Sequence, residues 1–143
     1  MKRESFEMLS VDRVMELWPK LEPLFDVACK GNEIAKDEID AKDIYVLAVT
    51  GLACVLVWFE DDEPACVLGI QFSMIGEHKC ADVIAMGGRS LMRFKIVCWQ
   101  SILDWLRANN VEFLDAYVPN NRAKIYLNKF GFNKSCSYVR MVL

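Results

Sequence analysis

The thiol and imidazole side chains of this sequence, which could bind zinc or act in catalysis, are six cysteines and one histidine. The cysteines lack the closely spaced CxxC pairs of structural zinc sites, so no metal site is predicted. Most of them lie in apolar runs and no secretory signal is visible, which favours reduced core thiols. His78 lies in the polar stretch GEHK, where we expect a solvated loop histidine, with a catalytic base as the alternative. The cysteines are Cys29, Cys54, Cys66, Cys80, Cys98 and Cys136.

Four cationic residues could contact a nucleic-acid backbone: Arg89, Arg93, Lys95 and Arg107. The net charge of the chain is −3 and its pI is about 5.2, which gives no general attraction to nucleic acids or anionic membranes. No apolar run reaches the roughly 18 residues that a membrane span needs. The sequence therefore predicts neither a nucleic-acid partner nor a membrane, and the expected location is the cytoplasm.

The 143 residues, of which 54% are apolar, predict a single domain over residues 1–143 with a sizeable core. Residues 4–9 alternate as a strand would, and Ser10 is a good N-cap for a helix that begins at Val11. Pro19 and Pro23 are expected to break or kink this helix, with a second piece from Pro23 to Cys29 and Gly31 as its stop.

The segment KDEIDAKDIYVLAVTG is ambiguous. It begins like a helix with Asp37 as the cap, whereas its second half has strand propensity. Three strand-like runs follow, and their short connections predict an antiparallel meander. These runs are Leu52–Phe59, Ala65–Met74 and Cys80–Met86.

Apolar residues at helical spacing then predict a long helix over Leu91–Asn109. The remaining predictions are a strand, a turn, a short helix stopped by Gly131, and a last alternating strand. Their ranges are Val111–Val118, Pro119–Asn121, Arg122–Lys129 and Ser135–Leu143. This order indicates an α/β protein with a mixed, mostly antiparallel central sheet flanked by helices.

The order of elements resembles the GCN5-related N-acetyltransferase (GNAT) superfamily, which has the acyl-CoA N-acyltransferase fold. Members often carry N-x-x-A-x-x-L-Y-E-K-x-G-F after the fifth strand, and NNRAKIYLNKFGF is similar to it. Asn120 and Ala123 match its start, and Lys129, Gly131 and Phe132 match its end. The resemblance covers the whole chain by element order and about 100–132 by residue pattern. Its strand count favours a helix for residues 37–50.

The pattern looks closer to divergent members of the family found in tailed bacteriophages. Gly87-Gly88 at the end of the fourth strand and the non-tyrosine residue Leu127 both carry this association. The family's reaction is attack by an amine on the thioester of acetyl-CoA, so acetyl-CoA is the expected substrate.

The resemblance also implies a set of acetyl-CoA contacts. The main chains of Val83, Ile84 and Ala85 would contact the pantetheine arm, and Asn120 would be a side-chain contact. The pyrophosphate loop should fall on Ser90–Lys95, which contains no glycine. The candidate phosphate ligands there are Arg89, Ser90 and Arg93, with Lys95 as a further nearby cation. Solvated helix residues are the alternative for Arg89 and Arg93.

The acid and base of the reaction are not identified by the sequence. Leu127 takes the place of the family's tyrosine and cannot donate a proton to the leaving thiolate. The catalytic candidates are Asp82 and Tyr126, although we expect Tyr126 to pack in the core. Asp115, Glu77 and His78 are further carboxylate or imidazole candidates, with solvated or structural roles as the alternative. Tyr117 and Tyr138 are tyrosines that could stand in for the missing acid.

Two functions fit these residues. The first is a phage-type, acetyl-CoA-dependent N-acetyltransferase that acts on an unidentified amine or protein. The second is a non-catalytic GNAT-like phage protein of the virion or of the host cytoplasm, with a phage or host protein partner or a second copy in a homodimer. Trp18, Trp58 and Trp99 are candidates for such a binding surface, with core burial as the alternative.

Overall fold

The computed structural model describes residues 3–30, 39–116, 120–134, 139, 141 and 143. Within this part of the chain a sheet of five strands has the order β1-β2-β3-β4-β5. β1 (Glu4–Met8), β2 (Ala53–Glu60), β3 (Glu63–Ile75) and β4 (His78–Gly88) are antiparallel, and β5 (Phe113–Ala116) runs parallel to β4. The predicted fold class is therefore confirmed, and so is the antiparallel meander.

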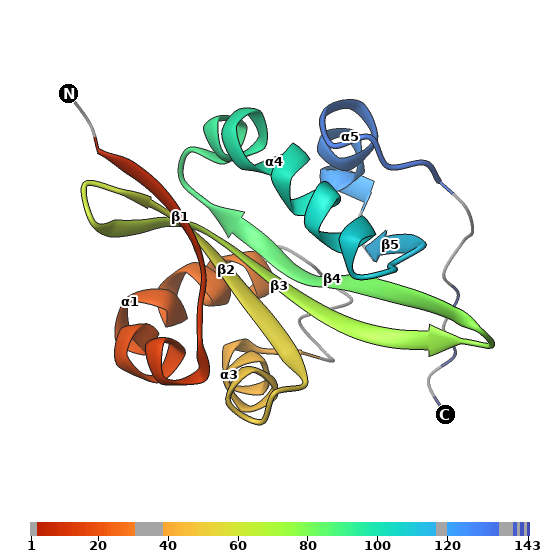
Figure 1. Ribbon diagram of the computed structural model, residues 1–143, viewed down its shortest axis with the longest axis horizontal. Helices are drawn as coiled ribbons and strands as arrows, with labels where there is room; N and C mark the ends of the chain where they lie inside the picture. The colour runs from red at the N-terminus through yellow and green to blue at the C-terminus, as the bar shows by residue number, and fades with distance from the viewer. Residues whose placement is uncertain (1–2, 31–38, 117–119, 135–138, 140, 142) are drawn as a thin grey trace.

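Helices cover both faces of the sheet (Figure 1). α4 (Leu91–Ala108) and α5 (Asn120–Lys129) pack on one face, and α1 (Val11–Lys30) and α3 (Ala41–Val49) on the other. Alternate residues of the strands fill the two cores, as Leu56 and Val57 of β2 illustrate. Burial of both faces removes most of the apolar surface from water, which is the main stabilising force of the fold.

α1 is one helix of 20 residues, so the predicted division into two pieces is wrong. Pro19 and Pro23 each lack an N–H, yet the helix continues through both. Leu21 and Phe25 lie beside these prolines with no exposed surface, and their burial offsets the lost hydrogen bonds. At the helix start the hydroxyl of Ser10 accepts the Arg13 N–H at 3.2 Å, as the predicted N-cap requires. Gly31, the predicted stop, lies outside the described residues.

α3 confirms that part of residues 37–50 is helical, but it begins at Ala41 rather than near Asp37. Asp40 is the N-cap, and its carboxylate accepts the Asp43 N–H at 2.9 Å. The Asp43 carboxylate accepts the Asp40 N–H at 3.0 Å, which completes a capping box. Ile44 is fully buried against the sheet. Tertiary burial and this cap outweigh the strand propensity of the sequence.

The C-terminal third departs from the predictions at its boundaries. β5 begins at Phe113 rather than Val111, and α5 begins at Asn120, where a turn was predicted. Residues 117 and 118, the predicted end of the strand, lie outside the described part. Asparagine favours both turns and helix starts, so the sequence signal was ambiguous. Gly131 has φ +83° just after α5, as expected of a helix stop. The predicted last strand falls mostly outside the described residues, and residues 139, 141 and 143 have no regular structure.

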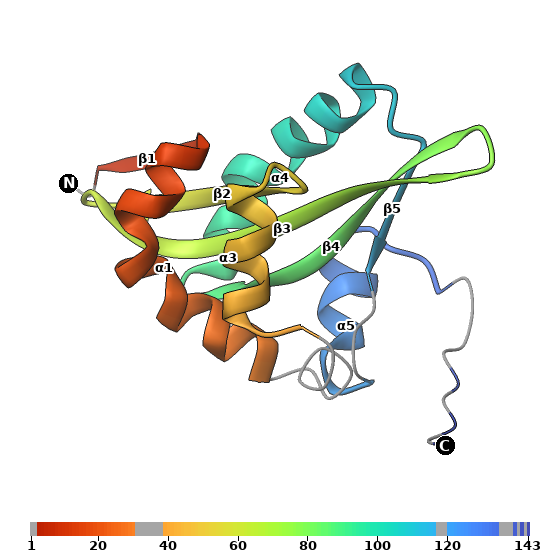
Figure 2. The same ribbon diagram turned by 90° about the horizontal axis from the view of Figure 1, so that it is seen from below.

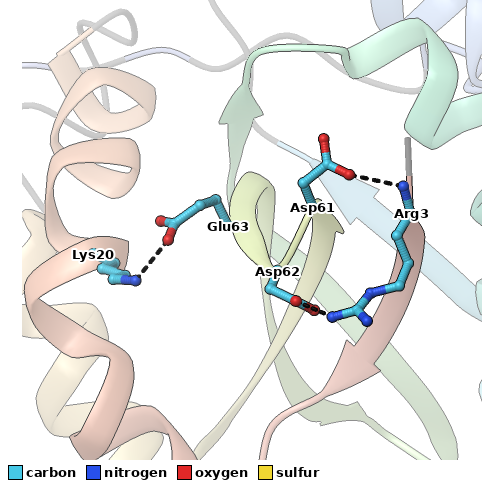
Figure 3. A network of polar contacts seen from close by, with 5 residues as sticks. All are labelled: Arg3, Lys20, Asp61, Asp62 and Glu63. Atoms are coloured by element: carbon cyan, nitrogen blue, oxygen red, sulfur yellow. Dashed lines mark hydrogen bonds and ion pairs between the residues drawn. The ribbon is translucent and has the colours of Figure 1, made fainter. Parts of the chain in front are cut away.

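The turn between β2 and β3 holds the edge of the sheet in place (Figure 3). Asp61 and Asp62 form its two central residues, both with positive φ, as two-residue hairpin turns require. The Arg3 N–H donates to the Asp61 carboxylate at 2.8 Å, and the Arg3 guanidinium donates to Asp62. Lys20 of α1 contacts Glu63 at 2.8 Å. These contacts connect β1 and α1 to one hairpin.

Candidate functional site

The main feature of the site is a free edge on β4. β4 pairs with β3 along its whole length, and its described pairing with β5 runs from Cys80 and Phe113 to Val83 and Ala116. Residues 84–88 of β4 therefore face no described strand on the β5 side. Five residues of strand span about 16 Å, and over that length the N–H and C=O groups on this edge have no strand partner among the described residues. An extended ligand could bind there as an added strand would.

A bulge at Ile84 marks the point where the edge begins. Gly69 of β3 lies opposite Ala85 and Ile70 lies opposite Val83, which leaves Ile84 as the extra residue. Val83 packs toward α4 and α5, whereas Ile84 and Ala85 pack toward α1 and α3. A bulge bends its strand, so β4 changes direction just after its last described pair with β5. The structure thus brings Val83, Ile84 and Ala85, the predicted pantetheine contacts, to the start of the free edge.

Gly69 makes room for the bulge. A Cβ at this position would lie 3.0 Å from Cγ1 of Ile84 and 3.4 Å from its Cδ1. Such a contact is tighter than side chains normally tolerate, so a larger residue would have to displace Ile84. The glycine in β3 and the bulge in β4 therefore belong together.

At its other end the free edge reaches the start of α4. Gly88, the last residue of β4, has φ +130°, and Ser90 has φ +62° as the N-cap of α4. The first helical bond joins the Phe94 N–H to the Ser90 carbonyl at 3.0 Å. The N–H groups of 91–93 precede this bond and have no acceptor inside the helix. Together with the helix dipole they favour an anion at this position.

The segment Ser90–Lys95, where the resemblance placed the phosphate loop, is helical from Leu91 onward. The side chain of Arg93 contacts the carboxylate of Glu4 on β1. Arg89 donates its backbone N–H to the Ala65 carbonyl at 2.9 Å and its guanidinium to the Pro64 carbonyl at 3.3 Å. Both arginines are thus held by protein groups, and the N–H groups of 91–93 remain as donors that an anion could contact.

Two aspartates lie side by side just before the free edge. Asp82 of β4 pairs with Asp115 of β5, one residue before the last described pair between these strands. The Ser73 hydroxyl of β3 is 3.4 Å from the Asp82 carboxylate. Burial raises the pKa of Asp82, the charge of Asp115 raises it further, and the hydrogen bond from Ser73 lowers it. A half-buried carboxylate with a raised pKa can act as a general base.

Asp82, Asp115 and Ser73 lie on the face of the sheet against which α1 and α3 pack. Ala81 and Val83 pack into the core under α4, so Asp82 between them points the other way. Figure 2 shows the β3–β4 hairpin projecting beyond α1 and α3, which cover the other end of the sheet. Ser73 is exposed, so this face is open to solvent beside Asp82. A second substrate could approach Asp82 from this side.

The other candidates lie elsewhere. Tyr126 is buried, with its ring against Phe130 and Phe132, which agrees with the predicted core packing. Leu127 is 40% exposed on α5. α5 begins at Asn120, whose side chain lies outside the described part, as do Tyr117 and Tyr138.

His78 is the first residue of β4 rather than a loop residue. It remains exposed, and its Nδ1 lies 2.6 Å from Glu112. Near it is a surface pocket of about 490 Å³ at the opposite end of β4 from the free edge. The pocket is lined by Glu77, Lys79, Arg107, Asn110, Val111 and Glu112. Since Asp82 and the bulge are not among these residues, the pocket is separate from the candidate site.

Several predicted alternatives can be compared with the described residues. Trp58 and Trp99 are buried, so their core interpretation is confirmed. Trp18 is half-buried and packs against Phe25 and Tyr45. No group of cysteine, histidine and carboxylate side chains suited to a metal occurs in the described part. Among the same residues no helix is long and apolar enough to cross a membrane.

Sequence reasoning missed the bulge at Ile84, the pairing of Asp82 with Asp115 and the ion pair that holds Arg93. A bulge leaves no residue signature in VIAM, and the two aspartates are 33 positions apart in the printed sequence. The only signal was that both aspartates interrupt apolar, strand-like runs, and this pattern could have suggested that they share a face.

Neither a protein-family model nor a curated protein matches the sequence. Solved structures do match over nearly the whole chain. One is a ribosomal-protein-alanine N-acetyltransferase from Brucella melitensis, with 14% identity, a TM-score of 0.68, and coverage of 98% of this chain and 99% of the other. Another is a GNAT family acetyltransferase from Staphylococcus aureus, with 14% identity, a TM-score of 0.66 and coverage of 98% of both chains.

A third is an aminoglycoside N-acetyltransferase in complex with CoA, with 9% identity and a TM-score of 0.68. The alignment covers 100% of this chain and 96% of that one. At these identities the similarity establishes the GNAT fold, which the sequence predicted, and leaves the activity to be argued from the site.

Proposed function

We propose that this protein is an acetyl-CoA-dependent N-acetyltransferase that transfers an acetyl group to an amine. The observation that carries the proposal is the free edge of β4, which begins at the Ile84 bulge and ends at the start of α4. One end of this edge has helix N–H donors for an anion, and the other end has a carboxylate base. The fold is shared with an acetyltransferase in complex with CoA.

In the proposed complex the pyrophosphate of acetyl-CoA lies at the N-terminus of α4, where the first-turn amides and the helix dipole favour negative charge. The pantetheine arm extends along residues 84–88 of β4 and bonds to their main chain. The thioester then lies where β4 and β5 meet, at Val83 and Ala116. Asp82 is one residue away from this pair, about 3.3 Å along the strand.

The proposed reaction follows from this placement. The amine nitrogen attacks the thioester carbon, the C–N bond forms, and the C–S bond breaks. The proton of the amine passes to the Asp82 carboxylate, and the sulfur leaves as the CoA thiolate. Leu127 has no proton to donate, so the thiolate takes its proton from water, and Asp82 returns its proton to solvent.

The acceptor belongs to the broad class of primary amines. Proteins of this fold include one named for a ribosomal protein and one named for aminoglycosides, so the fold does not select between protein and small-molecule acceptors. The phage-type assignment, which rested on Gly87-Gly88 and Leu127, stays a prediction, as do the cytoplasmic or virion location and the homodimer.

The test is thermal unfolding of the full chain with millimolar acetyl-CoA. A ligand that binds only the folded state at 100 times its Kd stabilises by about 2.7 kcal/mol, so the midpoint should rise by several degrees. Adenosine 3′,5′-bisphosphate, which lacks the pantetheine arm, is the control and should give a smaller shift. No shift with acetyl-CoA would refute the proposal and favour a non-catalytic binding protein. A panel of amines with detection of released CoA thiol then identifies the acceptor.

A further inference from the structure

The strongest remaining feature is the neighbour of the proposed base. Asp115 lies in register with Asp82 on the adjacent parallel strand, and both side chains lie on the same face of the sheet. Neighbouring strands are about 4.8 Å apart, so the two carboxylates lie within direct electrostatic reach. Neither aspartate forms an ion pair within the described residues. The charge of Asp115 therefore acts on Asp82 without a described cation between them.

We propose that Asp115 is a positioning residue that acts through Asp82, keeping its carboxylate ready to accept the proton of the attacking amine. This inference rests on the proposed function and goes one step beyond it, because Asp115 itself need not touch either substrate. Its role is to set the proton affinity and orientation of the base from the strand next to it.

The groups that face Asp82 from each neighbouring strand support this role. From β3, Ser73 donates a hydrogen bond to Asp82, and Gln71 lies opposite it in register. From β5 comes the Asp115 carboxylate. On β4 itself, the Cys80 thiol lies two residues away on the same face. Within the described part these neighbours bring one donor and one like charge to the proposed base.

The same cluster also acts on Cys80. Burial raises the pKa of the Cys80 thiol, and the charges of Asp115, Asp82 and Glu112 raise it further in that order. The Cys80 thiol is therefore uncharged at neutral pH. The charge that acts on Asp82 at neutral pH is then that of Asp115.

A second carboxylate beside a base raises the base's affinity for a proton, because two negative charges so close repel each other. Ser73 opposes this effect by stabilising the charged form, and it also fixes the direction of one carboxylate oxygen. A base with a raised pKa takes a proton from an amine more readily, as long as it is still deprotonated at the working pH. Asp115 favours the protonated form of Asp82 and Ser73 favours its charged form, so together they set the pKa of the base.

The decisive experiment is an NMR titration of the Asp82 side-chain carbonyl in the full chain labelled with ¹³C-aspartate, assigned with Asp82→Asn. In Asp115→Asn the midpoint of Asp82 should fall by about half a pH unit or more, because a neighbouring like charge has been removed. Asp115→Glu keeps the charge and should retain most of the raised midpoint. Asp104→Asn, on α4 at the other face, removes an equal charge elsewhere and should leave the midpoint unchanged.

The pH profile of acetyl transfer provides the matching kinetic readout. The acidic limb of kcat/KM should move to lower pH in Asp115→Asn by the same interval as in the titration, with the acceptor's own ionisation cancelling between variants. An unchanged Asp82 midpoint, or an equal shift in Asp104→Asn, overturns the inference alone. A titration shift with no acetyl transfer by the wild type at any pH overturns the proposed function, and with it the role of Asp115.

Discussion

Arg93 of α4 donates hydrogen bonds to both carboxylate oxygens of Glu4 on β1, with Nε–Oε1 at 3.1 Å and Nη2–Oε2 at 2.9 Å. This fork connects the first strand to the helix that begins beside the free edge of β4. The carboxylate side chain of Glu4 is 23% exposed, so it is the less solvated partner of the pair. An arginine that sequence reasoning assigned to phosphate binding is therefore engaged in fixing the position of α4.

The first prediction concerns this pair. Glu4→Gln should lower the free energy of unfolding by about 1 kcal/mol. It removes a partly buried carboxylate whose two oxygens both accept hydrogen bonds from Arg93. Glu63→Gln is the matched control, since the Lys20–Glu63 contact is more than half exposed at both side chains. Glu63→Gln should lower the free energy of unfolding by less than about 0.5 kcal/mol. Urea unfolding measures both, and equal losses would contradict the special role of Glu4.

The second prediction concerns Gly88. A Cβ there would overlap the carbonyl oxygen of Ala65 and lie 2.8 Å from the Cα of Cys66, at φ +130°. Gly88→Ala should therefore destabilise the protein by about 3 kcal/mol. Gly76→Ala has the positive φ without any neighbour within 4 Å, so it should cost only about 1 kcal/mol. Thermal unfolding of the two variants separates the overlap from the backbone strain.

The third prediction tests the missing acid. Leu127→Tyr places a phenol where the GNAT motif that NNRAKIYLNKFGF resembles has its tyrosine, and the 40% exposure of Leu127 leaves room for a larger ring. We expect kcat for acetyl transfer to rise by about tenfold or more, because a general acid would protonate the leaving thiolate. Leu127→Phe is the control with the ring and without the hydroxyl. Equal kcat values for the two variants would show that this position does not limit the reaction.

The fourth prediction concerns the buried thiols. Burial raises the pKa of Cys66 to about 12 and those of Cys29 and Cys98 to about 11, with nearby carboxylates adding to the effect. Thiolates are the reactive species, so these cysteines should resist alkylation at pH 8 while the protein is folded. A short iodoacetamide pulse followed by peptide mass spectrometry measures this. In urea the same thiols should react at the rate of free cysteine, and fast labelling of the folded protein would contradict their burial.

The fifth prediction is a pH dependence of stability at Asp82. Its pKa is raised in the folded state, so the folded protein binds a proton more tightly there than the unfolded chain does. The contribution of this group is therefore most favourable below its unfolded pKa and is lost as the pH rises through the folded value.

Asp82→Asn removes the charged carboxylate that makes the folded protein less stable above the pKa of Asp82. It should stabilise the protein at pH 7 by up to about 1 kcal/mol, a value limited by the partial exposure of the carboxylate. The gain should disappear near pH 3, where Asp82 is protonated in both states. Chemical unfolding at the two pH values measures the difference. A variant that is less stable than the wild type at pH 7 would contradict the direction of the pKa shift.

The sequence predicted the strands and helices well where a local signal existed. The apolar spacing from Leu91 to Leu106 predicted α4, and Ser10 predicted the start of α1. The helix break that it predicted at Pro19 and Pro23 is absent, because a local rule about proline could not weigh the burial of Leu21 and Phe25. The helix over Ala41–Val49 needed the strand count of a known fold, since its own residues favoured both states.

The residues by themselves determined the order of the elements, the two apolar faces of the sheet and the absence of a tyrosine at position 127. These properties depend on neighbours in the chain, so periodicity and residue type suffice to find them. The bulge at Ile84, the pairing of Asp82 with Asp115 and the capture of Arg93 by Glu4 were decided only by the tertiary structure. Each depends on strand register or on a contact between distant segments, and register is set by the packing of the whole sheet.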